Sequence, residues 1–123
     1  MLAILAVAMI PPALAESLEG DVARGRTLYK KCQGCHPLKP GKHNSWGPNL
    51  HGVIGRKAGS AEGYGYSDAL QAADFIWTAE RLEEFLRDPK AYLPGVTMVL
   101  KPLPDAQARA DIIAYITAAS SRD

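Results

Sequence analysis

The stretch KCQGCHP, residues 31–37, contains both cysteines of this 123-residue chain and places a histidine directly after the second. Three kinds of site use two thiols at this spacing: a dithiol redox centre, half of a zinc site, and the covalent anchor of a haem. The motif alone leaves all three open, and the rest of the sequence has to distinguish them.

The first two interpretations need neighbours that this sequence lacks. A dithiol oxidoreductase places its Cys-x-x-Cys pair after a strand and at the start of a helix. Here a helical pattern comes before the cysteines, and no strand pattern precedes them. A structural zinc site needs two more ligands, usually a closely spaced pair. Only His43 and His51 remain, and their separation of eight positions (51 − 43) is wider than usual.

Haem attachment accounts for every part of the motif. Two thiols at i and i+3 on a helical turn can each add to one vinyl group of a porphyrin. An imidazole at the next position can then bind the iron. We therefore predict one haem c, attached through Cys32 and Cys35, with His36 as the first axial ligand.

The second axial ligand is predicted by elimination. Met98 is the only methionine outside residues 1–15, and it ends the Pro- and Gly-containing turn YLPGVTM. Its thioether is the predicted ligand, although a single methionine can also serve as core filling. A second imidazole, from His43 or His51, is the competing choice.

Residues 1–15, MLAILAVAMIPPALA, have the form of an export signal. An apolar run is followed by two prolines and a small-x-small triplet that ends at Ala15, although no Lys or Arg precedes the run. The run is far shorter than the ~20 residues that span a bilayer as a helix. We expect cleavage after Ala15, a periplasmic protein without stable membrane insertion, and a single domain over residues 16–123.

Hydrophobic spacing predicts an all-α fold. Helices are expected from Asp21 to the motif, after the Ser67 cap, after the Thr78 cap, and over residues 105–119, because apolar residues recur at helical spacing there. Pro89 is expected to stop the third helix. Residues 91–104 and the long stretch between His36 and Tyr66 read as loops. A loop of the latter length indicates a large rigid ligand that holds it.

Charge is distributed unevenly along the chain. The formal net charge is +1, which gives no case for nucleic acid binding by the whole molecule. Between Asp21 and Glu62, however, there are eight basic residues and no acidic one. This arrangement predicts a dipole whose positive end docks acidic partners, although a solvated basic face is the alternative. The predicted docking residues are Lys30, Lys31, Lys39 and Lys42.

As a whole, the sequence resembles class I c-type cytochromes of the soluble, mitochondrial-like branch. The resemblance is carried, in order, by Gly25 and Tyr29, CQGCH, GPNLHGVIGRKAG, YSDA, Trp77, YLPGVTM and ADIIAYI. It implies the cytochrome c fold, in which short helices and long loops surround one covalently bound haem. The cysteines of CQGCH would carry the thioethers, while His36 and Met98 would bind the iron.

The resemblance also implies roles for further cofactor-binding residues. The Pro48 carbonyl would accept the hydrogen bond of the proximal imidazole. Arg56, Tyr66 and Trp77 would surround the buried haem propionate. Tyr92 would lie near the second iron ligand. For the aromatic residues, plain core packing is compatible with these roles.

The same resemblance predicts one helix crossing. Gly25 and Tyr29 would cross the last helix at Ile112 and Tyr115, where the glycine allows the two backbones to approach.

The chain also departs from the family pattern. Leu70 stands where the family commonly has Asn, Val96 where it commonly has Thr, and Leu100 where an aromatic residue is frequent. Trp46 has no usual counterpart.

An iron with both axial positions filled by protein has no open site for a substrate. We therefore predict an electron carrier rather than an enzyme. A monomer is the default expectation. The resemblance suggests a quinol-oxidising cytochrome complex as one redox partner, and an oxidase, a reaction centre or a periplasmic dehydrogenase as the other. The rival interpretation is a haem enzyme or gas sensor in which Met98 dissociates readily.

Overall fold

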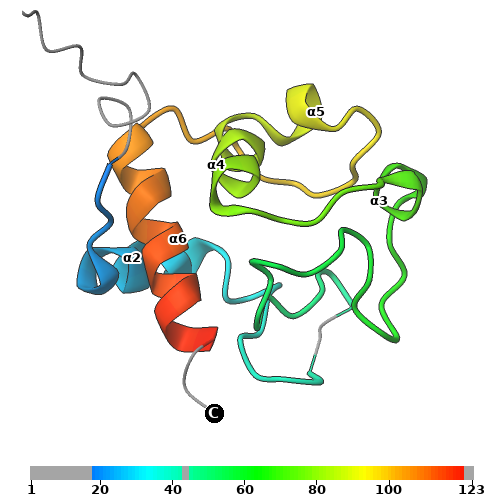
Figure 1. Cartoon of the computed structure of the whole chain (residues 1–123), viewed down its shortest axis with the longest axis horizontal. Coiled ribbons are helices and arrows are strands. Elements are labelled where there is room, and N and C mark those ends of the chain that lie inside the picture. Colours follow the sequence, from blue (N-terminus) through cyan, green and yellow to red (C-terminus); the bar gives the residue numbers. More distant parts are fainter. Residues whose placement is uncertain (1–17, 43–44, 121–123) are drawn as a thin grey trace, which may run out of the picture.

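The predicted all-α architecture is confirmed. A computed structural model describes residues 18–42 and 45–120, and within these ranges helices and turns form the fold without a β-strand. An isolated antiparallel bridge joins Lys57 to Ile76. The helices, in chain order (Figure 1), are α2 (Val22–Leu28), the 3₁₀ turn η1 (Tyr29–Lys31), α3 (Asp68–Ala72), α4 (Ala79–Arg87), α5 (Pro89–Tyr92) and α6 (Ala106–Ser120).

Polar side chains cap the predicted helices where the sequence indicated. The Asp21 carboxylate accepts the backbone N–H of Arg24 at 3.0 Å. Ser67 caps α3 and Thr78 caps α4 through equivalent bonds of 3.3 and 3.1 Å. Each cap satisfies an N–H group that has no partner within its helix, and each therefore defines where the helix begins.

One helix, α5, was not predicted from the sequence. Residues 89–92 form α5 rather than the start of a loop, because Pro89 occupies the first turn and the Asp88 carboxylate accepts the N–H of Ala91 at 3.3 Å. Proline stops a preceding helix, but its fixed φ also favours the first position of a new one. The same residue thus ends α4 and begins α5.

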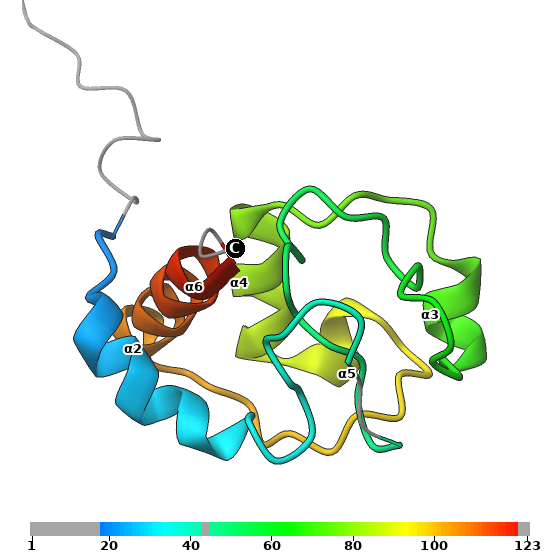
Figure 2. The same ribbon diagram turned by 90° about the horizontal axis from the view of Figure 1, so that it is seen from below.

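Helices α2 and α6 cross at a glycine (Figures 1 and 2). A Cβ built on Gly25 would collide with the backbone carbonyl of Asp111, so only glycine allows this approach. The rings of Tyr29 and Tyr115 pack beside it with centroids 5.3 Å apart. The crossing predicted at Tyr115 is present, but the closest backbone is that of Asp111, one residue before the predicted Ile112.

The core joins α4 to α6. The apolar stripes predicted on the two helices are buried, namely Leu82, Phe85, Leu86, Ile112, Ile113 and Ile116. Arg109 is also buried, and its guanidinium donates to the Glu83 carboxylate at 2.6 Å and to the Leu103 carbonyl. This pairing of a buried charge was not predicted, since the sequence does not show which residues α4 and α6 bring together.

No helix within residues 18–42 and 45–120 has the length and apolar character needed to cross a bilayer. The predicted export signal lies outside the described residues, as does His43.

Candidate functional site

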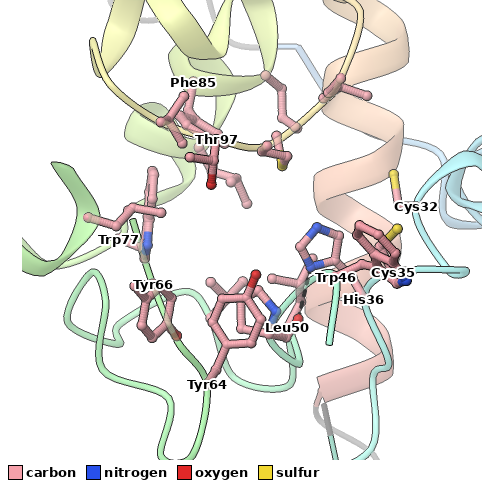
Figure 3. A pocket seen from close by; sticks show the side chains of 18 of the residues that line it. Cys32, Cys35, His36, Trp46, Leu50, Tyr64, Tyr66, Trp77, Phe85 and Thr97 are labelled. Atoms are coloured by element: carbon pink, nitrogen blue, oxygen red, sulfur yellow. Dashed lines mark hydrogen bonds between the residues drawn. The ribbon is translucent and has the colours of Figure 1, made fainter. Parts of the chain in front are cut away.

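A large cavity lies between the helices and the long loop that follows the cysteine motif (Figure 3). Its volume is about 510 Å³, within the range of small-molecule and cofactor sites. Most of the side chains that line it are apolar, such as Leu50, Val53 and Phe85. A mostly apolar hollow of this size with a few polar groups is typical of a ligand or cofactor site.

The cysteine motif forms one wall of the cavity. Cys32, Cys35 and His36 all line it, and the N–H of His36 donates to the carbonyl of Cys32 at 2.8 Å. This bond makes the predicted helical turn, which brings the cysteines to one side. The hydroxyl of the buried Tyr29 donates to the His36 carbonyl at 2.6 Å and ties the turn to the crossing of α2 and α6.

The imidazole of His36 projects into the cavity with a defined tautomer (Figure 3). Its Nδ1 lies 2.8 Å from the carbonyl oxygen of Pro48. Because a carbonyl can only accept, Nδ1 carries the proton and Nε2 is left with a lone pair. Burial lowers the pKa of His36, while the Pro48 hydrogen bond opposes this shift. A neutral imidazole with an available Nε2 is the form that binds a metal ion.

Two further residues, Gly47 beside the imidazole and Asn49 beside Arg56, belong to the site and were not predicted from the sequence. A Cβ on Gly47 would lie 2.7 Å from the Cys35 carbonyl oxygen and 2.8 Å from Cε1 of His36, so the backbone fits directly against the ring. Asn49 is buried, and its side-chain oxygen accepts a hydrogen bond from the Arg56 guanidinium. The Gly-Pro-Asn run around Pro48 is the sequence signal that could have indicated them.

On the cavity wall, Arg56 is a half-buried cation, and the hydrogen bonds described for it all go to neutral acceptors. Its guanidinium donates to the Asn49 backbone carbonyl at 2.7 Å, and to the Asn49 side chain and the His51 carbonyl at 3.2 Å each. Burial lowers the pKa of Arg56, and the nearby Tyr66 opposes this. A partly buried guanidinium bound to neutral groups is suited to receive an anionic group of a ligand.

Tyr66 and Trp77 line the same cavity as Arg56 (Figure 3). The Tyr66 hydroxyl accepts the N–H of Ala61 at 2.9 Å, which leaves its own proton to donate. Backbone bonds between Trp77 and residues 55 and 56 hold Trp77 next to Arg56.

The two remaining predicted residues, Met98 and Tyr92, lie at different depths relative to the cavity. Met98 lines the cavity, after a turn in which Gly95 has a φ of 95°. Tyr92 is not among the lining residues. Its ring stacks behind Trp77, with centroids 6.5 Å apart, and packs edge-on against Phe85 at 6.2 Å. Tyr92 therefore supports the wall rather than forming it.

Three departures from the family pattern also face the cavity. Leu70, Val96 and Leu100 line it, together with Phe85. These side chains carry no polar atom, so this part of the wall offers a ligand only apolar contact.

The geometry gives little support to the alternatives, namely a second imidazole ligand, a zinc site and a redox-active dithiol. His51, the described candidate for a second imidazole ligand, does not line the cavity, and its Nδ1 lies 3.2 Å from the backbone carbonyl oxygen of Leu38. The described residues include no group of three or more His, Cys, Asp or Glu that could hold a metal ion together. Burial raises the pKa of the Cys32 thiol, the opposite of what a redox-active thiolate needs.

A haem c fits these observations. The cavity has the volume and apolar lining for a porphyrin, two cysteines and an imidazole stand on one wall, and Arg56 offers a cation for a carboxylate. Both a nitrogen donor and a thioether donor line the cavity, and this is a ligand pair that haem iron accepts.

Comparisons with known proteins agree with this site. The family described as "Cytochrome c" matches residues 22–120. Cytochrome c2 of Blastochloris viridis is 43% identical over 109 residues, covering 89% of this chain and 83% of that protein. Cytochrome c-550 of Ancylobacter novellus is 45% identical over 97 residues, covering 76% of this chain and 91% of that protein. The structure of cytochrome cH from Methylobacterium extorquens matches with a TM-score of 0.75 and 40% identity, covering 80% of this chain and 99% of that one.

The fold and the site define a haem-binding protein of the all-α class. More narrowly, the chain belongs to the cytochrome c family and is a class I monohaem c-type cytochrome, with one covalently bound haem c. The general function of this family is electron transfer.

Proposed function

We propose that this chain carries one electron at a time between redox proteins, with thioether bonds at Cys32 and Cys35 and with His36 and Met98 as axial ligands. The single observation that supports this best is the hydrogen bond from His36 Nδ1 to Pro48, because it directs Nε2 into an apolar cavity that Met98 also lines. When bound, the haem supplies an iron that alternates between the ferric and ferrous states.

The protein's own residues would then tune that iron and protect it. Pro48 orients the imidazole and raises its basicity as a ligand. A thioether ligand favours the reduced iron and so a positive potential. Arg56 and the Tyr66 hydroxyl would neutralise a buried propionate. With His36 and Met98 both bound to the iron, the change of oxidation state would need little rearrangement, and the iron would offer no open position to a substrate.

The basic segment would dock acidic redox partners. Lys30, Lys31, Lys39 and Lys42 are exposed, and Lys31 lines the cavity. The partners that fit are a membrane quinol-oxidising cytochrome complex on one side and an oxidase, a reaction centre or a periplasmic dehydrogenase on the other. In this proposal the protein is exported, loses residues 1–15, and works as a monomer in the periplasm.

Optical spectra of the matured protein and of Met98→Ala test the proposal. The wild type should show a low-spin spectrum in both oxidation states and a weak red band from sulfur-to-ferric-iron charge transfer. Met98→Ala should lose that band and lower the midpoint potential. Val22→Ala is the matched control and should match the wild type, because Val22 is exposed on α2 and does not line the cavity.

The rival function, a haem enzyme or gas sensor, predicts the opposite pattern. A high-spin wild-type spectrum, or a Met98→Ala variant with an unchanged ferric spectrum and potential, would contradict His/Met ligation and favour the rival. A colourless matured product would contradict haem binding altogether.

A further inference from the structure

Trp46 is an exposed aromatic residue on the rim of the cavity. Its side chain is 80% exposed, and yet it is one of the residues that line the cavity, beside Cys35 and His36 (Figure 3). Isolated exposed apolar residues are common on protein surfaces and need no explanation. An indole on the rim of the only site that carries chemistry in the described chain is different, because a partner must approach that rim to exchange an electron.

The backbone holds Trp46 in this position. The following residue, Gly47, lies so close to Cys35 and His36 that a Cβ would contact both. The backbone therefore packs directly against the cysteine motif at this point, which places Trp46 next to the wall that carries Cys35 and His36. A second apolar side chain, Val99, is 97% exposed and also lines the cavity.

The charges on this rim have one sign. Lys31 lines the cavity and is exposed, and no Asp or Glu is found among the described residues that line it. Other exposed lysines belong to the same basic segment, at positions 30, 39 and 42. Exposed apolar side chains and exposed cations, Lys31 and Lys57, therefore occur together among the residues that line the cavity. The complement of such a surface is an apolar patch with carboxylates beside it.

We propose that Trp46, together with Val99, forms the apolar anchor of the docking surface, and that its occupant is a redox protein with an apolar patch ringed by acidic residues. This inference rests on the proposed electron-carrier function. Tryptophan is enriched among the residues that dominate binding energy, since its large rigid ring buries much area at a small cost in entropy. The lysines would steer the encounter, whereas Trp46 would set how long the complex lasts.

Steady-state oxidation by a purified mitochondrial cytochrome c oxidase, a membrane redox protein, tests the inference. Trp46→Ala should raise KM by about 5- to 30-fold, the effect of losing an interface anchor, with kcat unchanged. The increase should persist at high salt, because apolar contact is not screened. Trp46→Phe should have a KM much closer to that of the wild type. Ile76→Ala is the matched control, because Ile76 is 55% exposed but does not line the cavity.

The visible spectrum and the midpoint potential are measured for each variant. If Trp46→Ala shifts either one, the ring packs on the haem rather than on a partner, and the inference is overturned. The inference is also overturned if Trp46→Ala leaves KM unchanged or if its rise in KM disappears at high salt. The same holds if Ile76→Ala raises KM equally, or if the oxidase does not oxidise the wild type. Sedimentation that shows a wild-type dimer lost in Trp46→Ala would assign the surface to a second copy of the chain and overturn it too.

Failure of the proposed function would look different. In that case the wild type would lack the low-spin spectrum or would not cycle reversibly at an electrode. A wild type that cycles normally while Trp46→Ala behaves like the wild type contradicts only the docking role of Trp46.

Discussion

The Nδ1 atom of His36 donates a hydrogen bond to the backbone carbonyl of Pro48 across 2.8 Å. A main-chain acceptor cannot rotate away, so the tautomer of the ring is determined by the path of the loop. That path depends in turn on Gly47, whose backbone lies directly against the ring. The orientation of the proposed iron ligand is thus a property of the loop fold, twelve residues away along the chain.

The first prediction concerns this contact. Gly47→Ala should displace either the loop or the His36 ring, because the new Cβ would lie under 3 Å from three atoms of Cys35 and His36. Forcing extra volume into a packed site costs about 1–3 kcal/mol. Denaturant unfolding should show this loss, and the visible spectrum should show weakened axial ligation. Gly34→Ala is the control, because its Cβ meets nothing within 4 Å. Equal effects of the two substitutions would contradict the proposed role of Gly47.

The second prediction concerns the crossing of α2 and α6. Gly25→Ala should destabilise the fold by about 3 kcal/mol or more, since the Cβ would collide with a backbone carbonyl that cannot rotate aside. Thr27→Ala, at an exposed position of the same helix, should change the free energy of unfolding by no more than about 0.5 kcal/mol. Chemical denaturation with far-UV circular dichroism measures both. A Gly25→Ala protein as stable as the wild type would mean that the helices can separate without cost.

The third prediction concerns acid stability. The backbone N–H of Asp21 and the side chain of Gln107 donate to the Asp111 carboxylate and lower its pKa, with further help from Arg24. A carboxylate whose pKa is lower in the folded state stabilises the fold above its unfolded pKa of about 3.9. That contribution is lost as the pH falls through the folded pKa.

Asp111→Asn should therefore be less stable than the wild type at neutral pH, and the difference should shrink as the pH falls below about 4. Urea unfolding at a series of pH values measures this. Asp74→Asn changes an exposed acid outside this cluster and should have an effect of no more than about 0.5 kcal/mol throughout. A stability difference for Asp111→Asn that stays constant down to low pH would show that its charge does not matter.

The fourth prediction concerns steering by charge. Reversing two exposed lysines, Lys31→Glu and Lys42→Glu, should slow the second-order reaction with the oxidase at low salt. The difference should decrease as salt rises, because screening removes the attraction. Stopped-flow kinetics across ionic strengths measures it. Arg81→Glu and Arg87→Glu on α4 produce the same charge change outside the basic segment and are the control. A salt dependence identical to that of the wild type would support a merely solvated basic face.

Local patterns predicted much of this molecule. The caps at Asp21, Ser67 and Thr78 act between residues three apart, and such bonds are visible in sequence. The cysteine motif is also local, because a single turn brings its members to one side. Pro89 is an exception, because a proline can both end one helix and begin the next, and its neighbours in sequence did not show that it does both here.

Other features depend on residues that are distant along the chain. The resemblance to the family implied that Gly25 meets the last helix, but only packing decided that the Asp111 carbonyl lies against the glycine. Arg109 reads as an ordinary surface residue of a helix until Glu83, 26 positions earlier, is brought next to it. Tyr92 lies behind Trp77 rather than on the cavity wall because the depth of a ring depends on how several elements stack.

By itself, the sequence determined the helical class, the starts of α2, α3 and α4, and the chemistry of the thiol and imidazole groups, since these depend on neighbours within a few residues. The tertiary structure decided which atom of His36 faces the cavity, which cation and hydroxyl stand beside it, and that Trp46 is exposed on its rim. The reason is physical: these properties arise from burial and from contacts across long loops, and neither quantity exists until the chain has folded.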